Sequence, residues 1–213
     1  MRGLAALVLV LVVPIAAAAA GPHGRSEALT ALDARDAETR RLAAAELAEH
    51  GTMPDVPRLA RALRDSDPLV RAIAERSLWN VWSRSGDREI DALFANGLQE
   101  MSEGLGETAV KTFTRIIERK PDFAEGWNKR ATVLYMLGDY QKSLADCDEV
   151  MKRNPHHFGA LSGYGMIYLK LGEPGRALTY FERALAVNPN LTQVEENVQA
   201  LRRLLLERRK NTT

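Results

Sequence analysis

The chain has 213 residues, of which 29 are Lys or Arg and 28 are Asp or Glu. Because Arg2 lies in an apolar leader that we expect to be removed, the remainder carries equal numbers of basic and acidic residues and lacks the positive excess of nucleic-acid-binding proteins. Cys147 is the single cysteine, so an internal disulfide is excluded and stability has to come from buried apolar surface.

Residues 1–20, "MRGLAALVLVLVVPIAAAAA", have the pattern of a secretory signal peptide. Arg2 precedes an apolar run over residues 4–15, and small residues near position 20 suit cleavage. The run is shorter than the roughly 20 residues that span a bilayer, and Pro14 interrupts it, which favours export with cleavage over a membrane anchor. We therefore expect a periplasmic or secreted protein without stable membrane insertion after signal cleavage.

Residues 26–88 contain two similar segments at an offset of 31 residues, "LDARDAETRRLAAAEL" (32–47) and "LRDSDPLVRAIAERSL" (63–78). In each, an Asp is followed four residues later by an Arg and then by an Ala-rich helical stretch, as in Asp36 and Arg40. The pattern resembles short bacterial HEAT-like repeats. In such repeats the Asp caps a helix and the Arg pairs along a ladder of successive turns.

Trp79 and Trp82 end this segment and lie three residues apart, on one face of a predicted helix. We expect them to pack the junction with the region that follows. The alternative is the wall of a ligand pocket, which would suit an enzyme related to HEAT-like lyases. Since no long linker follows, the two regions are predicted to form one elongated body.

A second repeat, of 34 residues, covers residues 90–191. Glycine and proline recur at this interval between helix-favouring stretches, and the period and internal pattern resemble the tetratricopeptide repeat. The resemblance implies an all-α fold, a right-handed superhelix of helical hairpins (α-solenoid). The markers are Gly104, Gly138, Gly172, Pro121, Pro155 and Pro189, and the units are 90–123, 124–157 and 158–191.

Each preference of the repeat has a mechanical cause. Small residues at the eighth position, such as Gly97 and Gly165, let the two helices of a unit cross closely. The recurring glycine supplies the left-handed conformation that ends the first helix, and the recurring proline ends the second. Residues 192–210 then place Val194, Val198, Leu201 and Leu205 on one helical face, which predicts a capping helix over the exposed end of the array.

No catalytic signature accompanies the repeats. Cys147 falls at a repeat position that is normally buried, where a thiol is inert. The adjacent His156 and His157 lie in a turn, without the spacing of a zinc site, and are interpreted as turn residues. We expect no catalytic residue, no cofactor and no bound metal.

The family resemblance implies a concave groove that binds a protein or peptide and is lined by the first helix of each unit. Its methionines suit irregular apolar ligands, and the shape suits a helix or an extended peptide. The alternative is that several of these residues pack against residues 26–88 or the cap. The predicted groove residues are Phe94, Leu98, Met101, Asn128, Lys129, Thr132, Tyr135, Met136, Ser162, Met166 and Lys170.

Some tetratricopeptide domains hold the C-terminal carboxylate of cytosolic chaperones with Lys, Asn and Arg side chains at set repeat positions. Here these positions hold Phe94, Leu98, Lys129, Gly159 and Gly163, so that clamp is absent. The sequence therefore predicts a noncatalytic protein-binding scaffold or adaptor of the bacterial cell envelope. The alternative within the same class is a periplasmic assembly or maturation factor for exported clients.

Overall fold

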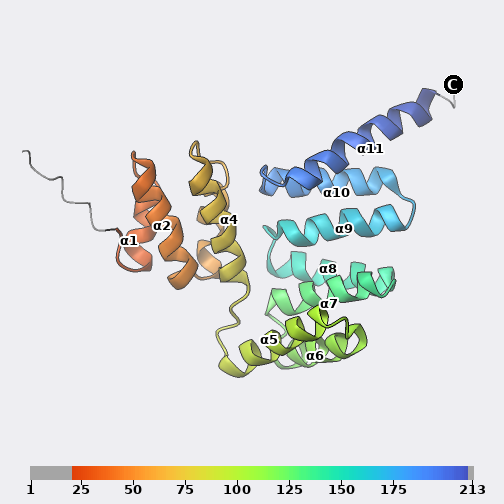
Figure 1. Ribbon diagram of the computed structural model, residues 1–213, viewed down its shortest axis with the longest axis horizontal. Helices are drawn as coiled ribbons and strands as arrows, with labels where there is room; N and C mark the ends of the chain where they lie inside the picture. The colour runs from red at the N-terminus through yellow and green to blue at the C-terminus, as the bar shows by residue number, and fades with distance from the viewer. Residues whose placement is uncertain (1–20, 211–213) are drawn as a thin grey trace, which may run out of the picture.

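The computed structural model describes residues 21–210, so the predicted signal peptide lies outside the described residues. Within this range the chain forms helices and turns and no strand, which confirms the all-α prediction. Figure 1 shows two groups of helices joined by one linker. No helix among residues 21–210 combines the length and the apolar character that a bilayer crossing requires.

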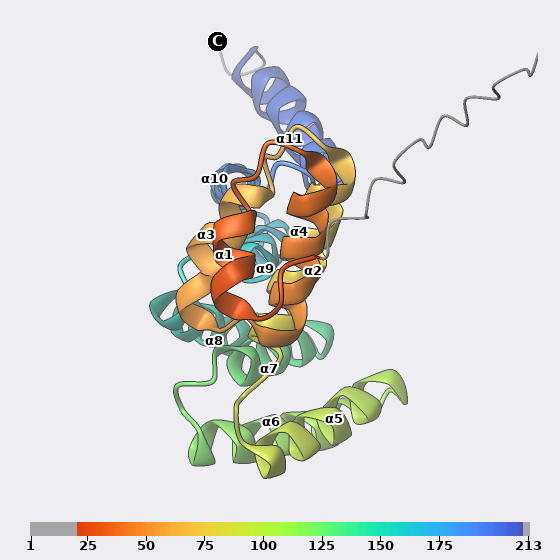
Figure 2. The same ribbon diagram turned by 90° about the vertical axis from the view of Figure 1, so that its left-hand side faces the viewer.

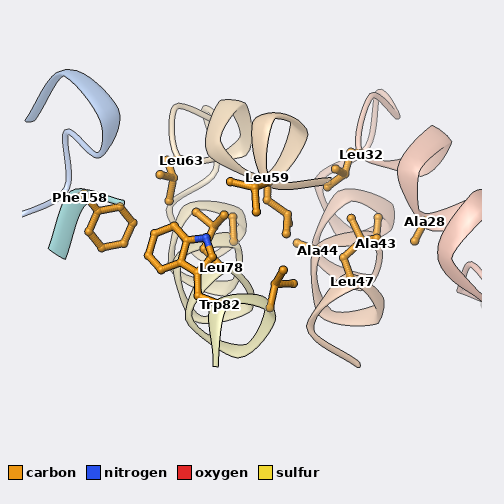
Figure 3. Packing of buried hydrophobic residues seen from close by; sticks show 13 residues of the cluster. Ala28, Leu32, Ala43, Ala44, Leu47, Leu59, Leu63, Leu78, Trp82 and Phe158 are labelled. Carbon is orange, nitrogen blue, oxygen red and sulfur yellow. The ribbon is translucent and has the colours of Figure 1, made fainter. Parts of the chain in front are cut away.

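The first group, called the N-terminal module, consists of two antiparallel helical hairpins. Its core lies between α2, α3 and α4, where Leu47, Leu59 and Leu78 are fully buried (Figure 3). The elements are α1 Arg25–Ala31, α2 Ala37–His50, the short 3-10 helix η1 Met53–Asp55, α3 Val56–Ala62 and α4 Pro68–Trp82.

The predicted Asp and Arg roles hold in the module. The Asp36 side chain caps α2 by accepting a hydrogen bond from the Thr39 amide, which satisfies one of the open N–H groups of the helix. Arg40 donates from Nε to Asp65 Oδ2 at 2.6 Å and also to the carbonyl oxygen of Ala34, so it ties two successive turns together.

The second group is the repeat array, in which three hairpins and a final helix stack in chain order (Figure 1). The predicted turn glycines all have the positive φ that a side chain disfavours, for example 83° at Gly138. The helices are α5 Arg88–Ser102, α6 Gly106–Arg119, α7 Ala124–Met136, α8 Tyr140–Arg153, α9 Phe158–Lys170, α10 Pro174–Val187 and α11 Thr192–Lys210.

Close helix crossings hold each hairpin of the array. A Cβ atom added at Gly97 would lie 2.7 Å from the ring of Phe113, and one added at Gly165 would lie 2.4 Å from the ring of Phe181. Both rings are completely buried. In these two hairpins the small residue at the eighth position is therefore needed because an aromatic ring of the second helix occupies the space of its side chain.

The prediction of one elongated body is wrong, because the module folds back along the array. The chain leaves α4, crosses residues 83–87 with Gly86 at a φ of 78°, and enters α5 at the far end of the array (Figures 1 and 2). The module contacts the start of α9, where the ring of Trp82 stacks on that of His157 with centroids 4.4 Å apart. It also contacts the turn before α11, where Arg71 Nε donates to Asn190 Oδ1 at 3.0 Å.

The open end of the Arg ladder explains this docking. Arg71 is the counterpart of Arg40, but the module has no third hairpin to supply the next carboxylate. Asn190 takes that place, and its Nδ2 donates back to the carbonyl oxygen of Leu63 at 2.8 Å. Arg64 adds a bond to the carbonyl oxygen of Val187 at 3.0 Å. The module thus uses the last turn of the array as its next repeat.

Candidate functional site

The first helices of the three hairpins, α5, α7 and α9, pack in sequence and form the face that we call the groove face. A cavity of about 180 Å³ opens on it between α7 and α9, and we call it the groove cavity. Four predicted groove residues line this cavity: Asn128, Thr132, Tyr135 and Met166. Its buried floor comprises Ala131, Ser143, Cys147, Ala160 and Ile167.

Two glycines open the groove cavity. Gly159 and Gly163 lie one turn apart on α9 and line it, whereas the same positions of α7 hold Glu125 and Lys129. A Cβ atom at Gly163 would reach ordinary contact with Cys147 Sγ, at 3.7 Å, so the cavity exists where that side chain is missing. In the sequence these glycines indicated only that a carboxylate clamp is absent. The space that they leave was not predicted.

Several other predicted residues expose apolar surface on the groove face. Met136 is 66% exposed, Leu98 39% and Met166 38%. Met101 is half-buried, and Lys170 is exposed at the end of α9. Exposed apolar side chains beside an apolar cavity favour a ligand that is itself apolar on the contacting side.

Phe94 corrects one of the predictions. Its side chain is only 5% exposed and packs edge to face against Phe113 and Phe123, with ring centroids 6.0 and 5.3 Å away. Phe94 therefore belongs to the core of the first hairpin and offers little surface to a partner.

Lys129 is engaged within the chain. Its amine lies 3.0 Å from Glu125 Oε1 and 5.5 Å from the ring centre of Trp79, so it joins α7 to the N-terminal module. The sequence left open that some predicted groove residues pack against residues 26–88, and Lys129 does so. Ser162, another predicted groove residue, is half-buried and donates its hydroxyl to the carbonyl oxygen of Phe158.

His157 is a turn residue, as predicted, but it is completely buried. Its Nδ1 accepts a hydrogen bond from the Ala160 amide and caps α9, so Nε2 carries the proton and donates to Glu125 Oε2 at 2.8 Å. Burial alone would raise the pKa of Glu125, but the hydrogen bond from His157 and the charge of Lys129 hold that pKa below its usual value. A buried polar pair thus secures the turn between the second and third hairpins.

Trp79 and Trp82 pack this junction, which confirms the structural interpretation of the pair. Trp79 meets Phe158 edge to face, with ring centroids 5.4 Å apart. The ring of Trp82 lies next to that of Phe158 (Figure 3), with centroids 5.0 Å apart. The sequence placed the tryptophans at a junction but did not indicate the partner, because His157 and Phe158 belong to a repeat far along the chain.

Ionisable groups on the described part of the chain do not form an obvious reactive centre. Burial, and next the charges of Asp146 and Asp148, raise the pKa of Cys147 to about 12, so its thiol stays protonated at neutral pH. Within residues 21–210, no three His, Cys, Asp or Glu side chains gather as they would around a metal ion.

Comparison with known proteins agrees with this architecture. Residues 122–190 match the tetratricopeptide repeat family. A TPR repeat-containing protein of Rhizobium etli is 33% identical over 138 residues, which cover 65% of this chain and 68% of that protein. The first TPR of Spaghetti (RPAP3), solved with the HSP90 peptide SRMEEVD, has a TM-score of 0.54 at 19% identity and covers 56% of this chain and 94% of its own.

A further solved structure, the Sgt2 TPR domain from Aspergillus fumigatus, has a TM-score of 0.56 at 17% identity and covers 60% of this chain and 85% of its own. At these identities the solved structures show a shared fold. The chain belongs to the tetratricopeptide repeat family. Proteins of this family are protein-binding scaffolds. The HEAT-like assignment of residues 26–88 and the signal peptide stay predictions.

Proposed function

We propose that this protein is a noncatalytic scaffold of the bacterial cell envelope that binds an apolar peptide segment or helix on its groove face. The observation that carries the proposal is the groove cavity between α7 and α9. Its floor is apolar and buried, its rim holds Tyr135 and Met166, and exposed Met136 continues the apolar surface beside it. Such a surface suits one anchoring apolar side chain with adaptable contacts around it.

The charge on the groove face favours an apolar ligand over an acidic one. Lys129 is paired with Glu125, and Gly159 and Gly163 stand where a carboxylate clamp would need cations. The RPAP3 domain was solved with a peptide that ends in acidic residues. We expect this protein to discriminate against such a peptide, because the groove has no equivalent charge to bind it.

The envelope location rests on the signal-like residues 1–20. Its test is N-terminal sequencing of the protein recovered from the periplasm of a bacterium that expresses the full chain. A mature chain that begins near residue 21 supports export. Recovery of the intact chain from the cytoplasm alone would overturn that part of the proposal.

The two alternatives make different demands. A maturation factor for exported clients would use the same groove with broad and weak affinity, whereas a scaffold has a preferred partner. For an enzyme with a pocket at Trp79 and Trp82 the two rings give little support, since both pack against His157 and Phe158, although Trp82 also borders a cavity on the side of the linker.

Photocrosslinking in the native compartment tests the groove directly. A photoreactive residue at Met166, which lines the groove cavity and is 38% exposed, should capture a defined partner, and the same probe at Leu137, which is 51% exposed but does not line the groove cavity, should capture less of it. Replacing Gly163 with Leu fills the cavity and improves helix propensity by about 0.8 kcal/mol, so lost capture could not be attributed to a weakened helix. Equal capture at both positions, unaffected by Gly163→Leu, would contradict the proposal.

A further inference from the structure

A second cavity, which we call the junction cavity, lies between the N-terminal module and the array, away from the groove cavity. It measures about 290 Å³. The module, the linker, the turn between α6 and α7, and the end of α8 all contribute to its wall. The lining residues are Met53, Trp82, Arg84, Ser85, Lys120, Asp122, Phe123, Ala124, Arg153 and Asn154.

The wall of the junction cavity carries three cations and one carboxylate. Arg84 donates to the carbonyl oxygens of Ala48 and Gly51, and no carboxylate of residues 21–210 lies within ion-pair distance of it. Lys120 Nζ is 3.9 Å from Asp122, a loose pair at the surface. Arg153 pairs with Glu149, so the positive excess around the cavity comes from Arg84 and the loosely paired Lys120.

Two buried donors on the wall have no acceptor. Asn154 is 2% exposed and Trp82 3% exposed, and neither the Asn154 Nδ2 nor the Trp82 Nε1 has a hydrogen-bond partner among the described residues. Asn188 has the same unpaired amide one repeat later, so the amide alone belongs to the repeat. At Asn154 it lies on the wall of a cationic cavity, where a ligand oxygen could supply the missing acceptor.

Helix α7 adds to the attraction for an anion. It begins at Ala124, which lines the cavity, and its N-cap residue Phe123 provides no side-chain acceptor for the first N–H groups. The Gly126 amide bonds to the carbonyl oxygen of Phe123, so the two preceding amides and the helix dipole are what favour a negative charge. Apolar surface from Met53, Trp82 and Phe123 lines the same space, so an anion with an apolar body fits better than an inorganic one.

We propose that the junction cavity binds a small organic carboxylate, with its charge toward Lys120 and Arg84 and its apolar body against Trp82 and Phe123. This site is separate from the groove and goes beyond scaffold function. A free carboxylic acid and the C-terminal residue of a peptide present the same chemistry, and the ligands used in the test separate the two sources.

Ligand-observed NMR with the full chain tests the proposal. The probes are N-acetyl-leucine, its uncharged methyl ester, a leucine-ending tripeptide with a free or amidated C-terminus, and inorganic phosphate. The acid should bind about tenfold more tightly than the ester, as expected for a charge-assisted hydrogen bond. If the free tripeptide binds and N-acetyl-leucine does not, the site is specific for peptide C-termini. If both bind, the site accepts carboxylates in general.

Two variants locate the binding. Lys120→Met should weaken binding of the acid about tenfold and leave the ester unchanged. Lys152→Met is the matched control, because Lys152 pairs with Glu149 and does not line the junction cavity. Asp122→Asn, at a side chain that is 78% exposed, should strengthen binding of the acid without affecting the fold.

The proposal is overturned by any of four results. These are equal binding of acid and ester, phosphate binding as tightly as the acid, equal losses in Lys120→Met and Lys152→Met, or no binding of any probe at millimolar concentration. Capture by the groove should be unaffected by Lys120→Met, so failure here leaves the groove proposal standing.

Discussion

The N-terminal module and the repeat array are both built from helical hairpins, but different forces hold them. In the module, Arg–carboxylate pairs join successive turns, as in Arg40 with Asp65, where both side chains are only 12% exposed. In the array, a glycine and a buried ring meet inside the first and third hairpins, as in Gly165 with Phe181. The first arrangement links neighbouring units through polar groups, whereas the second closes each unit by packing.

This difference determines how each region ends. A packed stack needs an apolar cap, and α11 supplies it through the buried residues Val194, Val198 and Leu201. A polar ladder leaves an unfilled hydrogen-bonding position after its last Arg, and Asn190 of the array fills it. The open end of one region therefore becomes the docking point for the other.

The largest expected effect is beside the junction, where the buried carboxylate of Glu125 in the array holds three neighbouring side chains. Glu125→Ala leaves His157, Asn128 and Lys129 without their common acceptor, and should lower the free energy of unfolding by about 3 to 5 kcal/mol. Urea unfolding measures this. Glu125→Gln, which keeps the shape and one acceptor, should cost less, and equal losses in the two variants would contradict a role for the charge.

Overpacking distinguishes the array from the module. Gly165→Ala places a Cβ atom against the Phe181 ring and should cost about 1 to 3 kcal/mol. Gly175→Ala is the control, because no atom lies within 4 Å of its added Cβ, and it should be neutral or slightly stabilising. Thermal unfolding of the two variants checks this, and a Gly165→Ala melt unchanged from wild type would contradict the close crossing.

Acid should weaken the module through its ladder. The hydrogen bond from Arg40 lowers the pKa of Asp65, and a carboxylate with a lowered folded-state pKa contributes stability above its unfolded pKa of about 3.9 that is lost as the pH falls through the folded value. Arg40→Met should therefore show a smaller loss of stability below about pH 4 than wild type. Urea unfolding across pH 2 to 7 measures how the free energy of unfolding depends on pH. Parallel curves for Arg40→Met and wild type would show that the pair of Arg40 and Asp65 does not cause the acid sensitivity.

The smallest expected effect concerns docking itself. Arg71→Met removes the bond to Asn190 and the bonds to the carbonyl oxygens of Asp65 and Ser66. It should cost about 1 kcal/mol, because hydrogen bonds at a half-buried site contribute little net stability. The informative measurement is protease cleavage in the linker over residues 83–87, which should accelerate as the module detaches. Arg76→Met, on the same helix, is the control, and equal cleavage rates would show that Arg71 does not control docking.

The sequence predicted what repeats locally and missed what depends on contacts between distant turns. The 34-residue period located the turn glycines, and the Asp and Arg pattern predicted Asp36 and Arg40 correctly. The fold-back could not be predicted, because it depends on pairing between Arg71 and Asn190, 119 residues apart. A short linker limits the distance between the module and the array, but it does not determine how the array is oriented relative to the module.

The candidate site was predictable only in part, for a related reason. Repeat positions located Tyr135 and Met166 on the groove face, but Phe94, chosen by the same rule, is buried because Phe113 and Phe123 surround it. Whether a glycine leaves a cavity, as at Gly163, depends on which side chains of the facing helix lie opposite it. The 34-residue period predicts neither the burial of Phe94 nor the cavity at Gly163.

The fold-back has a consequence for the order in which the protein matures. Ribosomes make the module first, but the turn that receives its ladder follows about 120 residues later, at Asn190. Until the start of α9 emerges, Trp79 and Trp82 also lack His157 and Phe158 to cover them. A chain interrupted before α9 would therefore display two uncovered indole rings, the kind of apolar surface that quality-control proteases and chaperones bind.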